Sequence, residues 1–314
     1  MRKHLQKMGL ALVVALLLST HAQLVFAASG SIGIVPAYPQ TGNQRSKGIF
    51  IHTLNGGDTA EDGVKIFNYT DEERTVVLGA VDSIAASDGS FSCKQNTEKR
   101  VAVGTWVQLS EEKVVIPAKS NVTVGFTITV PKDAGPGEHD GCITAQDTKN
   151  FAPKSGQGVL LGFRNAIRMA ITVPGDLVKK LSYQRVDIQR TDSGNYTVSP
   201  VLKNEGNVSL DVTTRVQLRG MFGGKSEIKT ANYPIIQEAT TGWPFEFKRP
   251  FWGGIYRAYT SVSYNANPED GLGVNTADQR KIRQDTGYFI MLPAPQAMTV
   301  ELGIPLLLIF ILAS

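Results

Sequence analysis

The feature that most constrains the fold is an alternation of apolar and polar residues between Lys113 and Gln146. In one run, every second position is apolar: Val122, Val124, Phe126, Ile128 and Val130. A period of two is typical of a strand with one face buried and the other exposed. Pro131 ends the run, because proline has no N–H to give to the strand ladder. The stretch therefore predicts β-sandwich structure.

The rest of the chain repeats this pattern. Strands are predicted at 48–54 and 63–68, with 74–81 as the antiparallel partner of the second. In the second half, 196–202 and 208–218 form a similar predicted pair. Strands about eight to twelve residues apart, with turn residues between them, are typical of an all-β sandwich or barrel. No sustained helical period with caps is present, so the fold class is all-β.

An internal repeat indicates two domains. The segment Lys65-Ile66-Phe67-Asn68 with the strand after it lines up with Val201-Leu202-Lys203-Asn204 and its following strand. Such self-similarity, with a junction at Pro174-Gly175-Asp176, predicts two tandem β-sandwich domains at 28–175 and 176–267. A lead at 29–46 precedes the first strand. A polar linker, 268–297, with one possible strand at 287–292, follows the second domain.

The amino terminus has the pattern of a secretory signal peptide. Arg2, Lys3 and Lys7 precede an apolar run, and cleavage is expected between Ala27 and Ala28, which makes 1–27 a signal peptide. A retained signal anchor is the alternative, which the short apolar run disfavours. Removing this segment reduces the 32 Lys and Arg residues to 29, against 28 Asp and Glu. The mature chain is nearly neutral, so no nucleic-acid partner is expected.

The chain contains two cysteines, Cys93 and Cys142. In an exported protein the favoured interpretation is one disulfide, which would stabilise the fold by roughly 3–4 kcal/mol. Two free thiols remain the alternative if the exporting cell lacks an oxidising folding system.

The chain finishes on an apolar run at 302–313 that is shorter than the roughly twenty residues of a membrane span. We interpret 298–314 as an incomplete C-terminal transmembrane segment. An ordinary hydrophobic last strand is the alternative.

The residues give no sign of catalysis. No nucleophile elbow, phosphate loop or metal-ligand spacing is present, so no catalytic residue, cofactor or metal is predicted. The one dense polar trio is Glu138-His139-Asp140. It is interpreted as a solvated turn, with a cation or general-acid site as the alternative.

Aromatic residues supply the candidate partner-binding set: Trp106, Trp243, Trp252 and Tyr256. Such residues form platforms for sugar or protein when exposed, and otherwise belong to the core. Four Asn-x-Ser/Thr triplets start at Asn68, Asn121, Asn195 and Asn207, and are interpreted as turn residues unless the host glycosylates exported proteins.

The run from Asp62-Gly63-Val64-Lys65-Ile66-Phe67-Asn68 to Val76 resembles the opening of the WxL-interacting proteins of Gram-positive cell surfaces. The segment Val130-Pro131-Lys132-Asp133-Ala134, with Gly137-Glu138-His139-Asp140-Gly141 after it, resembles the same family. The resemblance implies two immunoglobulin-like domains, the first binding peptidoglycan and the second contacting host or partner proteins, with a C-terminal membrane helix.

The predicted function is therefore that of a non-enzymatic, exported, membrane-anchored surface protein that binds cell wall or partner proteins. The alternative is a periplasmic pilus-type chaperone, which also has two immunoglobulin-like domains. It requires a basic anchor pair, for which Arg164 and Arg168 are the candidates. A surface hydrolase with a site assembled from scattered acids such as Glu138 and Asp140 is a further rival.

Overall fold

The computed structural model describes residues 31–86, 91–149, 164–222, 227–267, 270–272 and 279–297. The expected signal peptide, its cleavage site at Ala27 and Ala28, and the expected membrane segment 298–314 lie outside these residues. Within the part of the chain that is described, no helix is long and apolar enough to cross a membrane.

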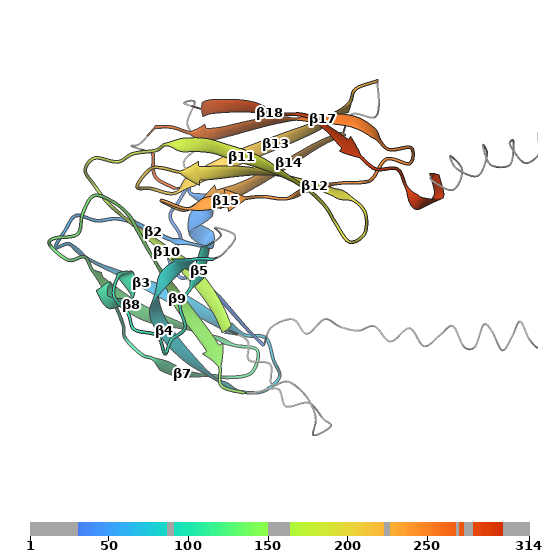
Figure 1. Ribbon diagram of the computed structural model, residues 1–314. Helices are drawn as coiled ribbons and strands as arrows, with labels where there is room; N and C mark the ends of the chain where they lie inside the picture. Colours follow the sequence, from blue (N-terminus) through green and yellow to red (C-terminus); the bar gives the residue numbers. More distant parts are fainter. Residues whose placement is uncertain are drawn as a thin grey trace, which may run out of the picture. The chain divides into compact units, whose positions relative to one another are not determined.

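The first set of strands forms two sheets, and Figure 1 labels their strands except β1 and β6. One sheet has the order β1-β3-β8-β6, and the other the order β2-β10-β9-β4-β5, with β7 paired to β4. The strands are β1 (Ile32–Pro36), β2 (Phe50–Thr53), β3 (Thr59–Asn68), β4 (Arg74–Ala85), β5 (Phe91–Cys93), β6 (Val107–Leu109), β7 (Lys113–Ile116), β8 (Asn121–Thr129), β9 (Gly137–Asp147) and β10 (Arg164–Val173).

The core of this first sandwich lies between its two sheets. The alternation that opens the sequence argument is seen in β8, where Val124, Phe126 and Ile128 are buried. They pack in one cluster with residues of the other sheet, among them Ile143 of β9 and Ile171 of β10. Burying side chains of this size stabilises the fold by about 1.5–3 kcal/mol each.

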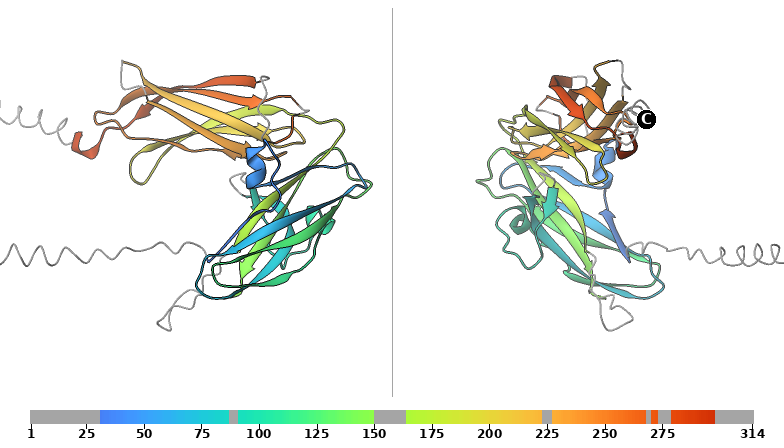
Figure 2. Two further views of the ribbon diagram at one scale, coloured as in Figure 1. Left: turned by 180° about the vertical axis from the view of Figure 1, so that it is seen from behind. Right: turned by 45° about the vertical axis from the view of Figure 1, so that its right-hand side comes forward.

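The second set of strands also forms two sheets, and Figure 2 shows both sets from two further directions. One sheet has the order β11-β12-β15, with β16 paired to β12, and the other the order β14-β13-β17-β18. The strands are β11 (Leu181–Arg190), β12 (Tyr196–Asn204), β13 (Leu210–Gly220), β14 (Glu227–Ile235), β15 (Thr240–Gly242), β16 (Phe245–Phe247), β17 (Gly254–Asn265) and β18 (Gln279–Met291).

The predicted all-β class is confirmed, since the described helical segments are short: η1 (Gln44–Lys47), α2 (Val103–Trp106) and residues 295–297. Two assignments differ. The residues placed in a linker at 268–297, with only a possible strand at 287–292, include β18, which begins at Gln279 and pairs with β17 over almost its whole length. The expected lead at 29–46 contains β1, which pairs with β3. The polar composition of 268–297 predicted a linker because β18 is an edge strand whose exposed face carries charged residues.

The two predicted hairpins are wrong. β3 pairs with β1 and β8, whereas β4 pairs with β9, β7 and β5, so these consecutive strands lie in opposite sheets. The same is true of β12 and β13 in the second sandwich. The repeated unit of strand, Asn, turn and strand is therefore a crossing from one sheet to the other.

One buried asparagine holds each crossing. The Asn68 amide nitrogen lies 2.7–3.0 Å from the carbonyl oxygens of Glu72, Ile116 and Pro117. The Asn204 amide nitrogen lies 2.8–3.2 Å from three others, those of Val208, Ile235 and Ile236. Each Asn side-chain oxygen accepts from the backbone N–H two residues later, at Thr70 and Gly206. Neither asparagine is more than 1% exposed, so both sites are shielded from water.

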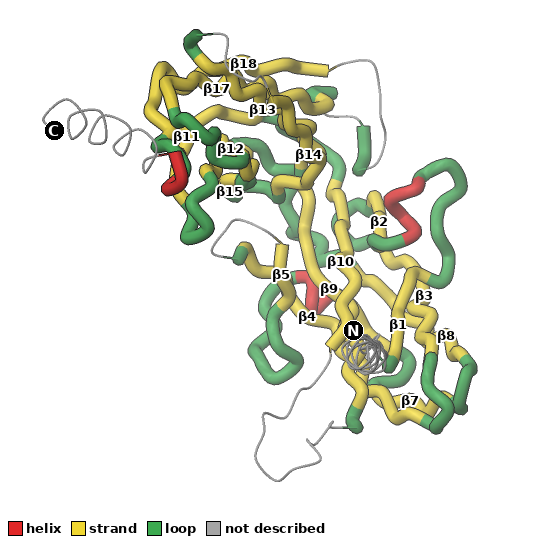
Figure 3. Tube along the Cα trace, turned by 90° about the vertical axis from the view of Figure 1, so that its right-hand side faces the viewer, coloured by secondary structure: helices red, strands yellow, loops and turns green. Residues whose placement is uncertain are grey.

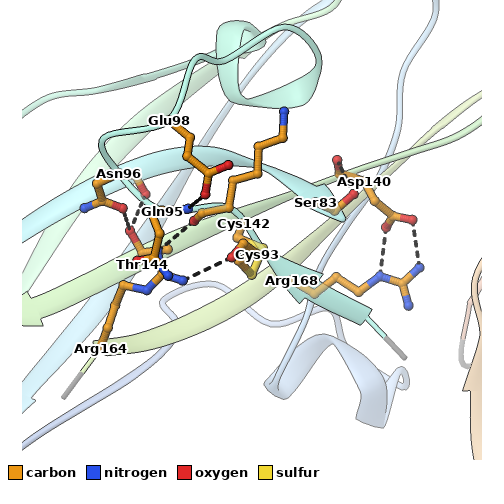
Figure 4. The surroundings of a disulfide bond; sticks show 12 residues. Ser83, Cys93, Gln95, Asn96, Glu98, Asp140, Cys142, Thr144, Arg164 and Arg168 are labelled. Atoms are coloured by element: carbon orange, nitrogen blue, oxygen red, sulfur yellow. Dashed lines mark hydrogen bonds and ion pairs between the residues drawn. A yellow bond between two sulfur atoms is a disulfide. The ribbon is translucent and has the colours of Figure 1, made fainter. Parts of the chain in front are cut away.

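The sulfurs of Cys93 on β5 and Cys142 on β9 form the expected disulfide (Figure 4). β5 pairs with β4 over only three residues, and β4 lies between β5 and β9 in the sheet. The disulfide therefore holds a short edge strand that strand pairing alone would fix weakly.

Replacing Asn68 or Asn204 by Ala should each lower the free energy of unfolding by roughly 2–4 kcal/mol, because buried carbonyl groups lose their donor. Urea unfolding followed by circular dichroism measures this. Asn121→Ala is the control, since Asn121 is exposed at the start of β8. Equal effects of all three changes would contradict the role of the buried amides.

Cys93→Ala/Cys142→Ala should lower the free energy of unfolding by roughly 3–4 kcal/mol, because the closed loop no longer restricts the unfolded chain. Urea unfolding of the wild type with and without reductant is the measurement, and the variant should be insensitive to the reductant. An unchanged unfolding midpoint in the reduced wild type would contradict the expectation.

Candidate functional site

The polar trio at 138–140 is not a solvated turn. Glu138 and Asp140 lie on β9 and are each only 5% exposed. Residues two apart on a strand share a face, so both carboxyl groups point to the same side of the sheet. Their neighbours Ile143 and Ala145 belong to the core on the other side. The two acids are therefore on the outer face of the sheet, and something else must cover them.

Arg168 of β10 neutralises part of this buried charge. Its Nε donates to Asp140 Oδ1 at 2.8 Å, and its Nη2 donates to Glu138 Oε1 at 2.6 Å. The Phe91 ring covers the guanidinium, with its centroid 5.0 Å from Arg168 Cζ. Figure 4 shows the guanidinium turned toward Asp140. One cation faces two carboxyl groups, so the three side chains carry a net negative charge when all are ionised.

The protonation of Glu138 follows from this excess of acid. Burial, together with the charge of Asp140, raises the pKa of Glu138 to about 7, against the opposing effects of Arg168 and Ser209. Burial alone lowers the pKa of Arg168, but the charges of Asp140 and Glu138 outweigh it, so that pKa is raised. Arg168 is therefore always charged, and Glu138 binds a proton near neutral pH.

Residues of the second sandwich cover the cluster. Ser209, just before β13, donates from its hydroxyl to Glu138 Oε1 and accepts from Arg168 Nη2 at 2.5 Å. The backbone N–H of Glu138 donates to the Asn207 carbonyl at 2.8 Å, and Gln237 Nε2 donates to the Glu138 carbonyl at 2.9 Å. Breaking a buried ion pair of this kind costs several kcal/mol. The segment 207–209 is thus attached to β9 and β10.

These contacts engage the residues that two of the rival hypotheses had named. Arg168 is fully engaged, and Arg164 donates to the carbonyls of Cys93 and Lys94 at 3.1 and 2.7 Å (Figure 4). The two arginines therefore do not form a free basic anchor pair. Glu138 and Asp140 are likewise occupied by Arg168, so they do not supply the acid pair that the hydrolase hypothesis requires.

The structure leaves one strand edge of the first sandwich open. β10 pairs with β9 along its whole length, from Arg164 to Val173. On its other side it pairs with β2 only from Met169 to Thr172. Among the described residues, no strand pairs with that side of the stretch 164–168 (β10 and its neighbours are labelled in Figure 3). We call this stretch the open edge. It presents N–H and C=O groups that a further strand could bind.

The chain before β2 turns away from this edge. The turn η1 is separated from β2 by two residues. The Asn43 side chain caps that turn by accepting from the Arg45 N–H at 3.1 Å. Arg45 also forms an ion pair with Asp211 of β13. The polar turn held by these contacts comes just before β2 and does not pair with β10, so β2 is short and the open edge stays unpaired.

The four aromatic candidates do not form one platform. Tyr256 is 8% exposed and belongs to the second core, and Trp106 packs against the first core. Trp243 is 44% exposed and stacks on Tyr233, and Trp252 is 60% exposed against Phe251. Only Trp243 and Trp252 remain as candidates for contact with a partner.

Sequence reasoning missed Ser209 and the open edge. Ser209 has no motif around it, and its importance comes from lying opposite Arg168. The spacing of Glu138 and Asp140 contained a usable signal, because acids two apart in a predicted strand share one face.

No family model and no curated protein sequence matches the chain. Among solved structures, it is similar to the class 5 fimbriae chaperone CfaA, at 12% identity and a TM-score of 0.39, over 80% of this chain and 99% of that one. It is also similar to the CupB2 chaperone of Pseudomonas aeruginosa, at 9% identity and a TM-score of 0.39, over 76% of this chain and 97% of that one. The E. coli chaperone DraB is similar at 13% identity and a TM-score of 0.36, over 80% of this chain and 98% of that one.

These comparisons correct the family expectation. The similar structures named above are chaperones, not WxL-interacting proteins, and no family model supports that resemblance. The expected function of a membrane-anchored cell-surface protein, with peptidoglycan or host proteins as partners, is wrong on the same finding. The first of the motifs that carried the resemblance is the strand–Asn–turn–strand pattern, which is a general solution for crossing between the sheets of a sandwich.

Glu138→Gln should remove a pH dependence of stability. The folded chain keeps a proton on Glu138 up to about pH 7, while the unfolded chain releases it near the ordinary value of 4.5. The wild-type free energy of unfolding should therefore fall by on the order of 1–3 kcal/mol as pH rises from about 5 to about 7.5. Glu138→Gln should be flat over that range.

Urea unfolding at a series of pH values measures this. Glu61→Gln, at an exposed position of β3, is the matched control and should keep the wild-type slope. A stability that rises with pH in the wild type over this range would contradict the assignment.

Proposed function

We propose that the chain is a periplasmic, non-enzymatic chaperone of the pilus type, the alternative named in the sequence analysis, with the open edge as its binding element in place of a basic anchor pair, since Arg164 and Arg168 are engaged within the chain. It would hold an exported polypeptide by adding one extended segment to the open edge of β10. The client would be a β-sandwich subunit that lacks one of its own strands. The single observation that carries the proposal is the unpaired side of residues 164–168 beside a β2 of only four residues.

The chemistry of the edge supports this use. Strand addition supplies main-chain hydrogen bonds for affinity, while side chains at alternate positions give specificity, and chaperone–pilin complexes use this mode. Ala166 is exposed on the outer face of the edge, while Ile167 is buried in the core. A small exposed residue leaves space for the side chains of an added strand.

The covered charge cluster supports a rigid edge. Arg168 ends the open edge and is held by four side-chain hydrogen bonds, to Glu138, Asp140 and Ser209. A pre-organised edge loses little conformational entropy when a segment binds. The disulfide agrees with an oxidising compartment outside the cytoplasm.

The test uses an immunoglobulin-like sandwich protein from which one edge strand has been deleted. The wild-type chain should suppress its aggregation, measured by light scattering. In the mixture, amide hydrogen exchange at residues 164–168 should slow by at least about tenfold, because those groups become paired.

Ala166→Lys should weaken this protection about fivefold while leaving thermal stability unchanged, since a lysine on an edge discourages strand addition. Thr129→Lys adds the same charge at an exposed position of β8 and serves as the control. Suppression of aggregation without slowed exchange at 164–168 would place the client elsewhere and overturn the site. No suppression at all would overturn the function.

A further inference from the structure

The outer face of the second sandwich carries a regular array of arginine and tyrosine side chains. It lies on the sheet formed by β13, β17 and β18, which are neighbours in Figure 1. Alternate residues of these strands point outward, because their neighbours are buried. We call this array the arginine–tyrosine face, and its members are Arg215, Arg219, Arg257, Tyr259, Arg283 and Tyr288.

The strand register places these residues in rows. Arg219 lies directly opposite Arg257, which lies directly opposite Tyr288. In another row, Ser261 has Arg215 opposite it on one side and Arg283 on the other. Like charges directly opposite each other destabilise a sheet. The directly opposed charges of Arg219 and Arg257 therefore do not themselves stabilise the sheet.

The tyrosine rings hold the guanidinium groups. Arg219 Cζ and Arg257 Cζ lie 5.1 and 5.2 Å from the centre of the Tyr259 ring, and Arg257 Cζ lies 5.4 Å from that of Tyr288. A guanidinium stacked on a ring still presents N–H donors at its edge, in a fork that matches a carboxylate. The arrangement keeps these donors in place with little loss of side-chain freedom.

The positive charge of the face is only partly compensated. Asp285 pairs with Arg257 at 2.6 Å. Neither Arg215 nor Arg283 forms an ion pair with any residue that the structure describes. Both line a shallow hollow of about 510 Å³ over Ser261, and Tyr259 and Asp285, the acid that pairs with Arg257, line it too. The small side chain of Ser261 lies between the two arginines in the register, so no bulky group separates them there.

We propose that the arginine–tyrosine face binds an acidic, extended polypeptide segment, with a carboxylate seated between Arg215 and Arg283. This is a second binding surface, on a different sandwich from the open edge, and it does not depend on strand addition. Outward residues along a strand recur about every 6.8 Å, and carboxylates at alternate positions of an extended segment have the same spacing.

The stacking favours a polypeptide over an acidic polysaccharide. Sugars bind proteins through free aromatic faces, but two guanidinium groups already lie over Tyr259 and one over Tyr288. The arginine–tyrosine face therefore presents hydrogen-bond donors and positive charge, and carboxylate side chains bind to both.

The experiment measures binding of fluorescently labelled poly-L-glutamate to the full chain by anisotropy, at low and high ionic strength. The wild type should bind, and more weakly at high salt. Arg215→Glu/Arg283→Glu should weaken binding by at least about tenfold, because both arginines face the seated carboxylate. Arg185→Glu/Lys203→Glu makes the same change in net charge on the other sheet, at exposed positions of β11 and β12, and should bind like the wild type.

Circular dichroism melting should show that both double variants are folded, since all four side chains are exposed. No binding by the wild type, or equal losses in both double variants, would overturn the proposal. Binding of polygalacturonate but not of poly-L-glutamate would also overturn it, in favour of an acidic glycan. Ala166→Lys should bind poly-L-glutamate normally, so failure of the open edge and failure of this face can be distinguished.

Discussion

The structure depends on how the charge of Arg168 is accommodated. This arginine lies on the outer face of a sheet, where solvent would normally hydrate it, yet it is 7% exposed. Ion pairs to Glu138 and Asp140 and a hydrogen bond to Ser209 replace the lost water. An unpaired charge at such a position would cost several kcal/mol, so the cluster forms only when β9, β10 and the segment before β13 are all in place. It therefore selects one arrangement of these three segments.

The edge strands of the sheets are held, or protected from unwanted pairing, in different ways. β5 is held by a disulfide, and β18 carries basic residues and an irregularity opposite Ala258. Charges and bulges of this kind prevent unwanted strand pairing. The open edge of β10 has neither a charge free to repel a strand nor a strand paired with it among the described residues, although the Asn165 amide donates to the Ile32 carbonyl of β1 at 2.6 Å. That contrast distinguishes it from the other edges as a place for a client.

The asparagine repeat reports on the fold and not on a particular function. Asn68 and Asn204 solve the same problem, which is to satisfy the carbonyl groups exposed where the backbone leaves one sheet for the other. Any sandwich with this crossing benefits from an amide there, whatever it binds. Fold-level likeness of this kind says little about function, which has to be argued from exposed groups.

The sequence by itself determined the period-two strands, the all-β class, the cysteine pair and the repeated Asn, because these depend on local patterns and composition. It did not determine which strands pair, and it placed β3 and β4 in one hairpin although they lie in opposite sheets. Alternation shows which residues share a face, but not what covers that face. Only the tertiary structure buried Glu138, Asp140 and Arg168, placed Tyr256 in the core with Trp243 exposed, and aligned Arg215 with Arg283 across Ser261. Each of these depends on contacts between residues distant in sequence, which no local pattern specifies.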